Sequence, residues 1–451
     1  MLSDAHIQIL NKHNPVNKYF IVYWMQASQR VHTNPAFEYA KQVANKRQKR
    51  LVVYFGITDQ FPEANLRHFT FMLQGLKEVQ AELKQMGIPM IVRLESPETG
   101  ILNLAEQADL VVTDRGYLRL QKAWRSAVAE TLQCPLVQVE GDVIVPVEMV
   151  MQKEAYSAAV IRPKVHRLLD VFLYPWVETD YYQTLFLPDL ESEDLSDIHL
   201  ILNRLDIDRT VESVPQFTGG YSCACTHLNR FIELRLNGYQ EFRNHPNFDY
   251  QSELSPYLHF GQISPLEIAL QIQKAGGAGS EEFLEQLIIR RELAINFVHF
   301  NTYYDNFACL PEWVVKTLRN HENDVRPNLY TLEELNAAET HDTYWNAAQK
   351  EMVQTGKMHG YMRMYWGKKI LEWTQNPINA FQLALCLNNK YSLDGRDPNG
   401  FAGVAWCFGK HDRPWGERSV FGTVRYMNAN GLKRKFDMEA YLDKVGTIPT
   451  S

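Results

Sequence analysis

The sequence lacks the features that mark several large classes of protein. Its six cysteines are scattered through 451 residues and, apart from the close pair Cys223 and Cys225, show no metal-site spacing. A large, non-repetitive chain of this kind is not a disulfide scaffold, so we expect reduced thiols and a cytoplasmic location. Residues 1–14 have no apolar signal-peptide core, and no apolar run approaches the roughly 18 residues of a membrane helix. We therefore expect a soluble protein with neither a metal site nor a membrane span.

Two common chemical signatures are also missing. No G-x-G-x-x-G motif follows the first predicted strand, so a dinucleotide site of the usual Rossmann kind is not expected there. No paired-carboxylate motif for general acid and base catalysis is evident. The net charge of -7 argues against indiscriminate nucleic-acid binding, although it leaves room for a local basic face. Aromatic residues, in contrast, make up 12% of the chain, which fits large cores, a flat ligand or electron transfer.

The hydrophobic pattern differs between the two halves of the chain. In the first half, β-branched and aromatic runs alternate with helix-like segments, which indicates a parallel sheet covered by helices on both faces. The expected strands are 19–24, 51–57, 89–94, 110–113 and 136–139, and the expected helices between them are 35–46, 63–86, 100–108 and 119–133. After Thr226 helical periodicity dominates, and the expected helices are 226–243, 256–274, 280–299, 311–320, 332–338, 343–353, 356–374 and 378–387.

These patterns predict two large domains. Residues 1–173 should form an α/β domain with a Rossmann-like parallel sheet, and residues 226–451 an all-α domain. The intervening residues 174–225 are rich in acidic residues and in helix breakers, so we interpret them as a surface connector whose acidity is most simply a solvated face.

A stretch near the C-terminal end has the densest pattern of aromatic and charged residues. Thr355 can cap a helix and no proline follows before Pro377, so a single helix is predicted over 356–374. Trp366 and Trp373 would then stand on one face, about 10 Å apart along the axis. Such a pair can be a buried aromatic stripe or, with further indoles nearby, part of an electron path.

A second candidate is the segment around Ser255 and Pro256. Pro256 suits the first position of a helix and Ser255 its cap, so backbone N–H groups there could face an anion such as a pyrophosphate. A serine and proline at a helix start are common, and an ordinary helix entry is equally compatible with the pattern.

Several ungapped motifs together resemble the class II cyclobutane pyrimidine dimer photolyases, of the photolyase and cryptochrome family. The resemblance covers nearly the whole chain in the right order. Its motifs are VYWM (Val22–Met25), LSPYLHFGQIS (Leu254–Ser264), DTYWNA (Asp342–Ala347), KMHGYMRMYW (Lys357–Trp366), KILEW (Lys369–Trp373), DGRDPNG (Asp394–Gly400) and RYM (Arg425–Met427).

The resemblance implies an N-terminal antenna-type domain and an all-α domain that holds FAD. In such enzymes light excites the reduced flavin, which passes one electron to a flipped-out pyrimidine dimer; the cyclobutane ring opens and the electron returns. The implied partner is UV-damaged DNA, bound by a monomer with access to DNA. A deazaflavin or a reduced folate has precedent in the family as antenna chromophore, and the sequence selects neither.

The resemblance also assigns residues to the cofactor and to electron transfer. Arg363 and Asp394 should form a salt bridge beside the flavin, although such a pair can simply satisfy two charges. Asn388 should face the central-ring nitrogen, where its amide oxygen can accept a hydrogen bond, and it favours repair over signalling. Trp366, Trp345 and Trp373 match the photoreduction chain, with Trp366 nearest the flavin and Trp373 outermost. The implied cofactor contacts are Tyr239, Gln251, Ser252, Glu253, Leu254, Ser255, Lys357, Arg363, Asn388, Asp394 and Gly395.

The implied lesion pocket departs from the family pattern at two positions. Trp406 should stack on the lesion, with Met364 as another wall and Arg243 as a phosphate or base contact. Arg290 stands where the family commonly has tryptophan, and Gln286 where it has glutamate. Arginine can stack or bind phosphate, and glutamine can donate a hydrogen bond but no proton. The alternatives are therefore another lesion, such as the six-four photoproduct, or a cryptochrome-like flavin photoreceptor.

Overall fold

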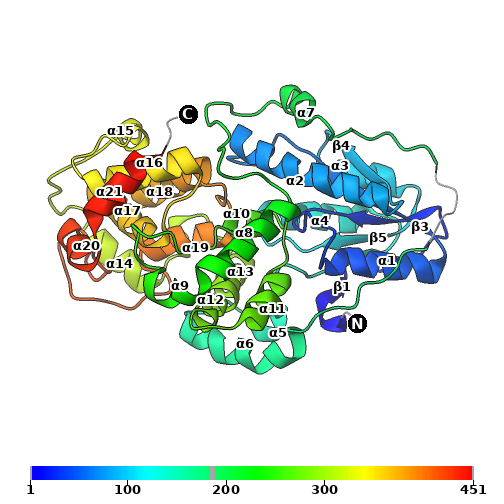
Figure 1. Cartoon of the computed structure of the whole chain (residues 1–451), viewed down its shortest axis with the longest axis horizontal. Coiled ribbons are helices and arrows are strands. Elements are labelled where there is room, and N and C mark those ends of the chain that lie inside the picture. Colours follow the sequence, from blue (N-terminus) through cyan, green and yellow to red (C-terminus); the bar gives the residue numbers. More distant parts are fainter. Residues whose placement is uncertain (1–2, 183–187, 449–451) are drawn as a thin grey trace.

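A computed structural model describes residues 3–182 and 188–448 (Figure 1). The α/β part contains, in chain order, η1 (Asp4–His6), β1 (Ile7–Ile9), β2 (Phe20–Trp24), α1 (Pro35–Arg47), β3 (Arg50–Gly56), α2 (Leu66–Gln85), β4 (Met90–Arg93), α3 (Pro97–Ala105), β5 (Ala108–Asp114), α4 (Arg119–Thr131) and β6 (Leu136–Val139). The elements that follow are α5 (Val147–Val150), α6 (Ala158–Phe172), α7 (Ile198–Arg204), α8 (Tyr221–Leu234), α9 (Leu236–Phe242), α10 (Ser255–His259), α11 (Pro265–Ala275), α12 (Ser280–Leu284), η2 (Glu285–Arg290), α13 (Arg291–Phe300), η3 (Phe307–Cys309), α14 (Glu312–Asn320), α15 (Leu332–Ala337), α16 (Thr343–Thr355), α17 (Gly360–Trp373), α18 (Pro377–Tyr391), α19 (Pro398–Cys407), α20 (Ala429–Lys435) and α21 (Met438–Gly446).

The strands of the described residues form one six-stranded sheet in the order β1-β6-β5-β2-β3-β4. All neighbouring pairs are parallel except β1 and β6. Residues of β2 alternate between two cores: Ile21 and Tyr23 pack with α1 and α2, whereas Phe20, Val22 and Trp24 pack with α3 and α4. A central strand that is buried on both faces has a continuous run of apolar residues. This run is why the strand could be predicted from the sequence.

The predicted alternation of strands and helices in the α/β part is confirmed, with one addition. The five predicted strands correspond to β2 through β6, with ends that differ by no more than a few residues. The edge strand β1 was not predicted. It has only three residues, and its antiparallel pairing with β6 depends on a partner about 130 residues away in the sequence.

Part of the segment predicted as a connector packs against the sheet. Helix α7 lies in this segment, and Ile198, Ile201 and Leu202 join the same core as α2. Helix α8 begins at Tyr221, within the predicted range, and residues 183–187 of that range lie outside the described residues. The acidic side chains of this segment are exposed or half-buried, whereas Ile198, Ile201 and Leu202 are buried against α2.

The second half is helical, as predicted, and its described residues contain no strand. The expectation of one helix over 256–274 is wrong, because α10 and α11 are separated by a turn at Gly261. Gly261 has φ of 64°, and a Cβ there would lie 1.8 Å from the carbonyl oxygen of Ala27, in the loop after β2. Only glycine allows this close approach between the two halves. The cap expected at Ser255 also shifts, since Leu254 precedes the first helical residue.

The helix expected over 356–374 starts later than predicted. Thr355 is the last residue of α16 rather than a cap, and Gly356 ends that helix in the left-handed region with φ of 73°. Helix α17 then begins at Gly360, where the His359 side chain accepts a hydrogen bond from the Tyr361 N–H. A glycine that can adopt positive φ is a common helix terminator, and here it separates two helices.

Candidate functional site

A cavity of about 570 Å³ opens among α9, η2, α13, α17 and α19. Its size is in the range of pockets that bind small organic ligands. Ten of the residues proposed from the sequence line it: Tyr239, Arg243, Gln251, Ser252, Ser255, Gln286, Arg290, Met364, Asp394 and Trp406. Segments far apart in the sequence thus contribute to one site.

Charged side chains form a connected group at one wall of this cavity. Lys357 Nζ donates a hydrogen bond to Ser255 Oγ at 2.8 Å, and Arg363 Nη1 donates to Asn388 Oδ1 at 2.7 Å. The predicted salt bridge is present, with 3.7 Å between Arg363 Nη2 and Asp394 Oδ1. Burial opposes ionisation of Asp394, yet Arg363 and Lys357 outweigh it and hold the pKa of this carboxyl below its ordinary value. The wall therefore carries fixed charges of both signs.

One atom of this wall is left without a hydrogen-bond partner. Asp394 Oδ1 is buried and accepts no hydrogen bond in the protein, although Asp394 lines the cavity. A buried acceptor without a donor is costly, so the site suits a ligand that brings an N–H or O–H group to this position.

Several proposed cofactor residues lie behind the cavity surface instead of on it. Leu254 is 1% exposed within an apolar core, and Asn388 is completely buried. The Glu253 carboxylate binds His227 and Arg235, which together with Lys357 outweigh burial and lower the pKa of Glu253 to about 2. Glu253, Leu254, Lys357, Arg363, Asn388 and Gly395 are absent from the residues that line the cavity. Of these residues, Lys357 and Arg363 hold Ser255 and Asn388 in place by hydrogen bonds.

The three proposed tryptophans are in contact with one another. Trp345 lies between the other two, with its ring centroid 6.4 Å from that of Trp366 and 5.6 Å from that of Trp373. Trp366 Nε1 donates to Gln349 Oε1, and Trp345 Nε1 donates to the carbonyl oxygen of Trp366. All three are at most 2% exposed. The predicted separation of Trp366 and Trp373 on one helix is thus bridged by an indole from α16.

The proposed substrate residues line the same cavity. Met364 and Trp406 come from α17 and α19, which pack against each other. Arg243 Nε lies 3.0 Å from Glu282 Oε1, an atom that also accepts a hydrogen bond from Gln286 Nε2. The Arg290 side chain is 51% exposed, with Nε 3.3 Å from Glu285 Oε1.

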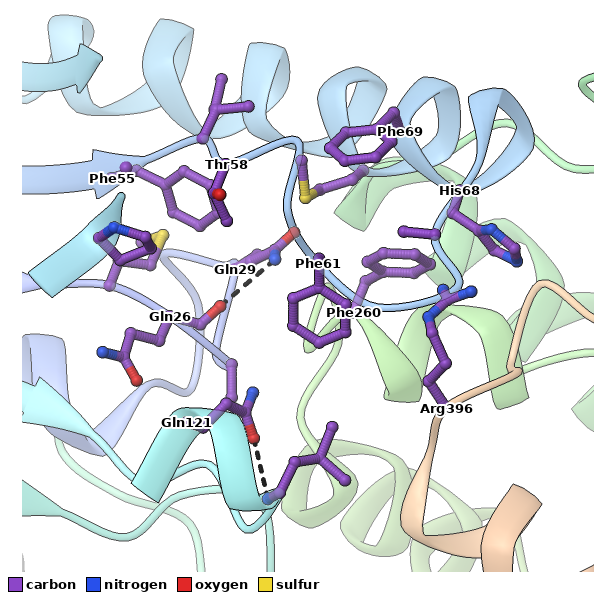
Figure 2. A pocket seen from close by; sticks show the side chains of 18 of the residues that line it. Gln26, Gln29, Phe55, Thr58, Phe61, His68, Phe69, Gln121, Phe260 and Arg396 are labelled. Carbon is purple, nitrogen blue, oxygen red and sulfur yellow. Dashed lines mark hydrogen bonds between the residues drawn. The ribbon is translucent and has the colours of Figure 1, made fainter. Parts of the chain in front are cut away.

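A second, smaller cavity of about 120 Å³ lies in the α/β part (Figure 2). Gln26 and Gln29 reach it from the loop after β2, Thr58 from the loop after β3, and Phe260 and Arg396 from the helical part. Ligands of open parallel sheets bind at this place, outside the carboxyl ends of strands where the strand order reverses. Sequence analysis proposed none of these residues, although polar side chains after predicted strands were a signal for them. Both polar atoms of the Gln26 carboxamide and Gln29 Oε1 are buried without hydrogen-bond partners.

Comparison with known proteins supplies the family. A family model described as DNA photolyase matches residues 21–181. The chain is 49% identical to the deoxyribodipyrimidine photo-lyase of Methanothermobacter thermautotrophicus, over 99% of both chains. The chain belongs to the DNA photolyase family. The photolyase of Potorous tridactylus is 40% identical over 94% of this chain and 81% of its own, and that of Arabidopsis thaliana 36% identical over 95% and 89%.

Solved photolyase structures share the fold. A bacterial class III photolyase from Agrobacterium tumefaciens has a TM-score of 0.72 at 17% identity and covers 95% of this chain and 87% of its own. An archaeal photolyase from Sulfolobus tokodaii, described with two FAD molecules, has a TM-score of 0.70 at 17% identity, with 94% and 89% covered. Both comparisons confirm the predicted architecture of a parallel sheet domain followed by a helical domain.

Membership of the photolyase family makes the chain an enzyme of photolyase-type DNA repair. The six cysteines are free, as expected. Among residues 3–182 and 188–448, no cluster of side chains could hold a metal ion. No helix in the same residues is long and apolar enough to cross a membrane.

Proposed function

We propose that this photolyase is a class II enzyme that repairs cyclobutane pyrimidine dimers in DNA by light-driven electron transfer. The observation that carries the proposal is the 570 Å³ cavity, where residues suited to a cofactor and residues suited to a base meet. FAD is the proposed cofactor, and in its reduced form it supplies an excited electron donor. We further propose that the enzyme acts as a monomer, with residues 1–173, 174–225 and 226–451 as sheet domain, connector and catalytic domain.

The residues present fit this cofactor. Ser252 and Ser255 offer two hydroxyl groups at the cavity surface for phosphates or ribityl oxygens, and the Lys357 cation lies behind Ser255, 2.8 Å from its hydroxyl oxygen. Asp394 Oδ1 lacks a donor, and a ligand N–H group would satisfy it. Arg363 donates to the side-chain oxygen of Asn388 at 2.7 Å, which fixes this buried amide behind the cavity surface; its contact with the flavin stays a prediction. Tyr239 and Gln251 complete the proposed contacts on the same wall.

Other residues of the cavity lining suit a nucleotide that has left the DNA stack. Trp406 and Met364 offer an aromatic face and a polarisable thioether to a base, which is the usual way in which a flipped base is held. Gln286 adds a hydrogen-bonding amide, and Arg243 and Arg290 lie at the rim, where cations can meet phosphates. Substrate and cofactor would share one cavity, which provides the short path that electron transfer needs.

The tryptophans provide a proposed route for electrons through the protein core to the cofactor. Trp366 would be the indole nearest the flavin, Trp345 the central one and Trp373 the outermost. The ring centroids along this row are 6.4 and 5.6 Å apart, so each indole is in contact with the next and each electron-transfer step is short. Because each ring is uncharged, the row can be buried at no electrostatic cost.

The second cavity is a proposed antenna site in the α/β domain. Unsatisfied amide atoms of Gln26 and Gln29 and the flanking Phe260 ring suit a flat heterocycle with donors and acceptors at its edge. A deazaflavin and a reduced folate both meet this description. The proposal is tested by extracting the bound compounds from the purified protein and recording their absorption spectra. The protein must be made in a host that synthesises the deazaflavin or the reduced folate. If such protein releases only flavin, the proposal of an antenna site is contradicted.

The decisive experiment is light-dependent repair of an oligonucleotide that contains one thymine dimer. The purified, photoreduced protein should restore intact thymines under near-ultraviolet or blue light and not in the dark. Trp406→Ala should lose most of this activity, because base stacking on an aromatic ring is worth about 1–3 kcal/mol. A matched oligonucleotide with a six-four photoproduct tests the other lesion. Photoreduction without repair of either lesion would instead support a cryptochrome-like photoreceptor.

A further inference from the structure

The helix that borders the rim of the large cavity has an unusual turn. Residues 285–290 form a π-helical turn between α12 and α13, in which the Arg291 N–H donates to the carbonyl oxygen of Gln286, five residues earlier. Such turns are rare and frequently mark functional sites. In a regular α-helix two residues five positions apart point about 140° away from each other around the axis. The wider π-helical turn brings them to the same side.

This turn places Glu285 and Arg290 in contact. Arg290 Nε lies 3.3 Å from Glu285 Oε1. The same carboxylate receives two shorter hydrogen bonds from Arg162 of α6, at 3.0 Å from Nε and 2.6 Å from Nη2. A two-point contact between guanidinium and carboxylate is the stronger arrangement. Glu285 is therefore held mainly by Arg162, and Arg290 is held weakly.

The neighbouring charges leave Arg290 as the available cation of the rim. Arg243 faces Glu282 at 3.0 Å, so its charge is matched. His411 lines the same cavity, and burial lowers the pKa of its imidazole to about 4, which leaves it neutral at pH 7. Gln286 carries no charge. Arg291 also lines the cavity, but it is buried and donates to the carbonyl oxygen of Asp142. Of the three guanidinium groups that face Glu282 and Glu285, those of Arg162, Arg243 and Arg290, the half-exposed Arg290 has the weakest contact and can turn outward.

We propose that Glu285 tethers Arg290 in the DNA-free protein, and that Arg290 exchanges this carboxylate for a backbone phosphate of the damaged strand. The inference rests on the proposed function. Arg162 stays on Glu285 throughout, so this partly buried carboxylate keeps a partner when Arg290 leaves. The contact adds affinity and positions the strand without reading its sequence, as phosphate contacts do.

The proposed tether predicts an indirect effect of Arg162. Its removal should weaken DNA binding, although the Arg162 side chain itself need not contact DNA. Without Arg162, Glu285 has Arg290 as its remaining partner and holds it more firmly. Removal of Glu285 should have the opposite effect, because Arg290 is then free. Combining the two changes should restore the binding that Arg162→Gln loses.

The test is the salt dependence of binding to an oligonucleotide with one thymine dimer, measured in the dark with the flavin-loaded protein. Arg290→Gln should weaken binding and lower the slope of log K against log salt by about 1, the value for one phosphate contact. Glu285→Gln should tighten binding to damaged and undamaged DNA alike. Repair at saturating DNA should stay near that of the wild type in Glu285→Gln, because Glu285 does not line the cavity and the change acts on binding.

Two results would overturn the proposal. One is an unchanged slope for Arg290→Gln. The other is weak DNA binding by the double variant Arg162→Gln, Glu285→Gln, equal to that of Arg162→Gln alone. This result would mean that Arg162 contacts DNA itself. The absorption spectrum of the bound flavin shows whether each variant keeps a folded site. If the wild-type protein does not bind damaged DNA at all, the proposed function is refuted. This outcome differs from an unchanged salt slope in Arg290→Gln, which refutes only the proposed tether.

Discussion

The indole rings of Trp345 and Trp366 lie parallel, with 5° between their planes. Trp345 Nε1 donates to the carbonyl oxygen of Trp366 at 3.0 Å, so the side chain of one residue is fixed to the backbone of the other. Gln349 Oε1 accepts the remaining indole N–H at 2.9 Å. The pair is held by hydrogen bonds that suit neutral rings, in the core between α16 and α17.

This relationship predicts the effect of Trp345→Phe. Phenylalanine fills most of the space, but it is much harder to oxidise and cannot make the hydrogen bond to Trp366. We expect photoreduction of oxidised flavin by an external reductant to be nearly lost, while repair by chemically reduced enzyme persists. Flavin absorbance under blue light measures the first and dimer repair the second. Trp24→Phe is the matched control, because Trp24 is an equally buried indole of the sheet domain. Equal photoreduction in the two variants would exclude the proposed route.

The contact between Arg363 and Asn388 predicts the effect of a charge at position 388. Asn388→Asp would place a second carboxylate beside Arg363, in competition with Asp394. Two buried carboxylates that share one cation cannot both stay ionised easily, so the pKa of one should rise. We expect an altered flavin spectrum and less repair with photoreduction retained. Asn388→Ala, which removes the oxygen without adding charge, separates the two causes; identical repair in both variants would show that charge is irrelevant.

Two buried lysines allow a matched test of cofactor binding. Lys357 donates to Ser255 beside the large cavity, whereas Lys368 donates to the Cys407 carbonyl behind it. A hydrogen bond to a charged group is worth about 1.5–3 kcal/mol, so Lys357→Met should weaken FAD binding about tenfold to a hundredfold. Lys368→Met should lower thermal stability with little change in FAD affinity. Titration of flavin-free protein with FAD measures both, and an equal loss in the two variants would contradict the assignment of Lys357.

The carboxyl group of Glu292 should make stability depend on pH. It is buried between the two halves, where Oε1 accepts hydrogen bonds from the Ile144 and Val145 N–H groups, and burial raises its pKa to about 8. A glutamate in the unfolded chain has a pKa near 4.3. Between these values the folded state holds one proton more, so the free energy of unfolding falls by about 1.4 kcal/mol for each pH unit of increase.

The variant Glu292→Gln tests this dependence, because glutamine keeps the accepting oxygen and cannot ionise. We expect equal stability of variant and wild type near pH 4, and a more stable variant at pH 8.5. Thermal unfolding from pH 4 to 8.5 measures the difference. The exposed Glu281→Gln serves as control and should leave the slope unchanged. Parallel curves for Glu292→Gln and the wild type would show that Glu292 does not hold the proton.

Local patterns in the sequence predicted most of the architecture. The apolar runs of β2, β3 and β5 and the periodic helices stood out because burial on one or two faces imposes a regular spacing of side chains. The misplaced boundaries have other causes. The break at Gly261 depends on a contact with the distant loop after β2, which no local window contains. The start of α17, in contrast, follows from Gly356 and His359, which lie in the local sequence and were read as part of one helix.

The sequence by itself determined the family of this protein, the order of its sheet and helical parts, and the residue types available for a cofactor, a base and an electron path. Its motifs also placed ten residues that line one cavity. Only the tertiary structure decided which side chains line that cavity and which support it from behind, that Trp345 bridges Trp366 and Trp373, and that Glu285 holds Arg290. The physical reason is that residue identity and spacing are local properties, whereas partners, burial and pKa depend on how helices from distant parts of the chain pack together.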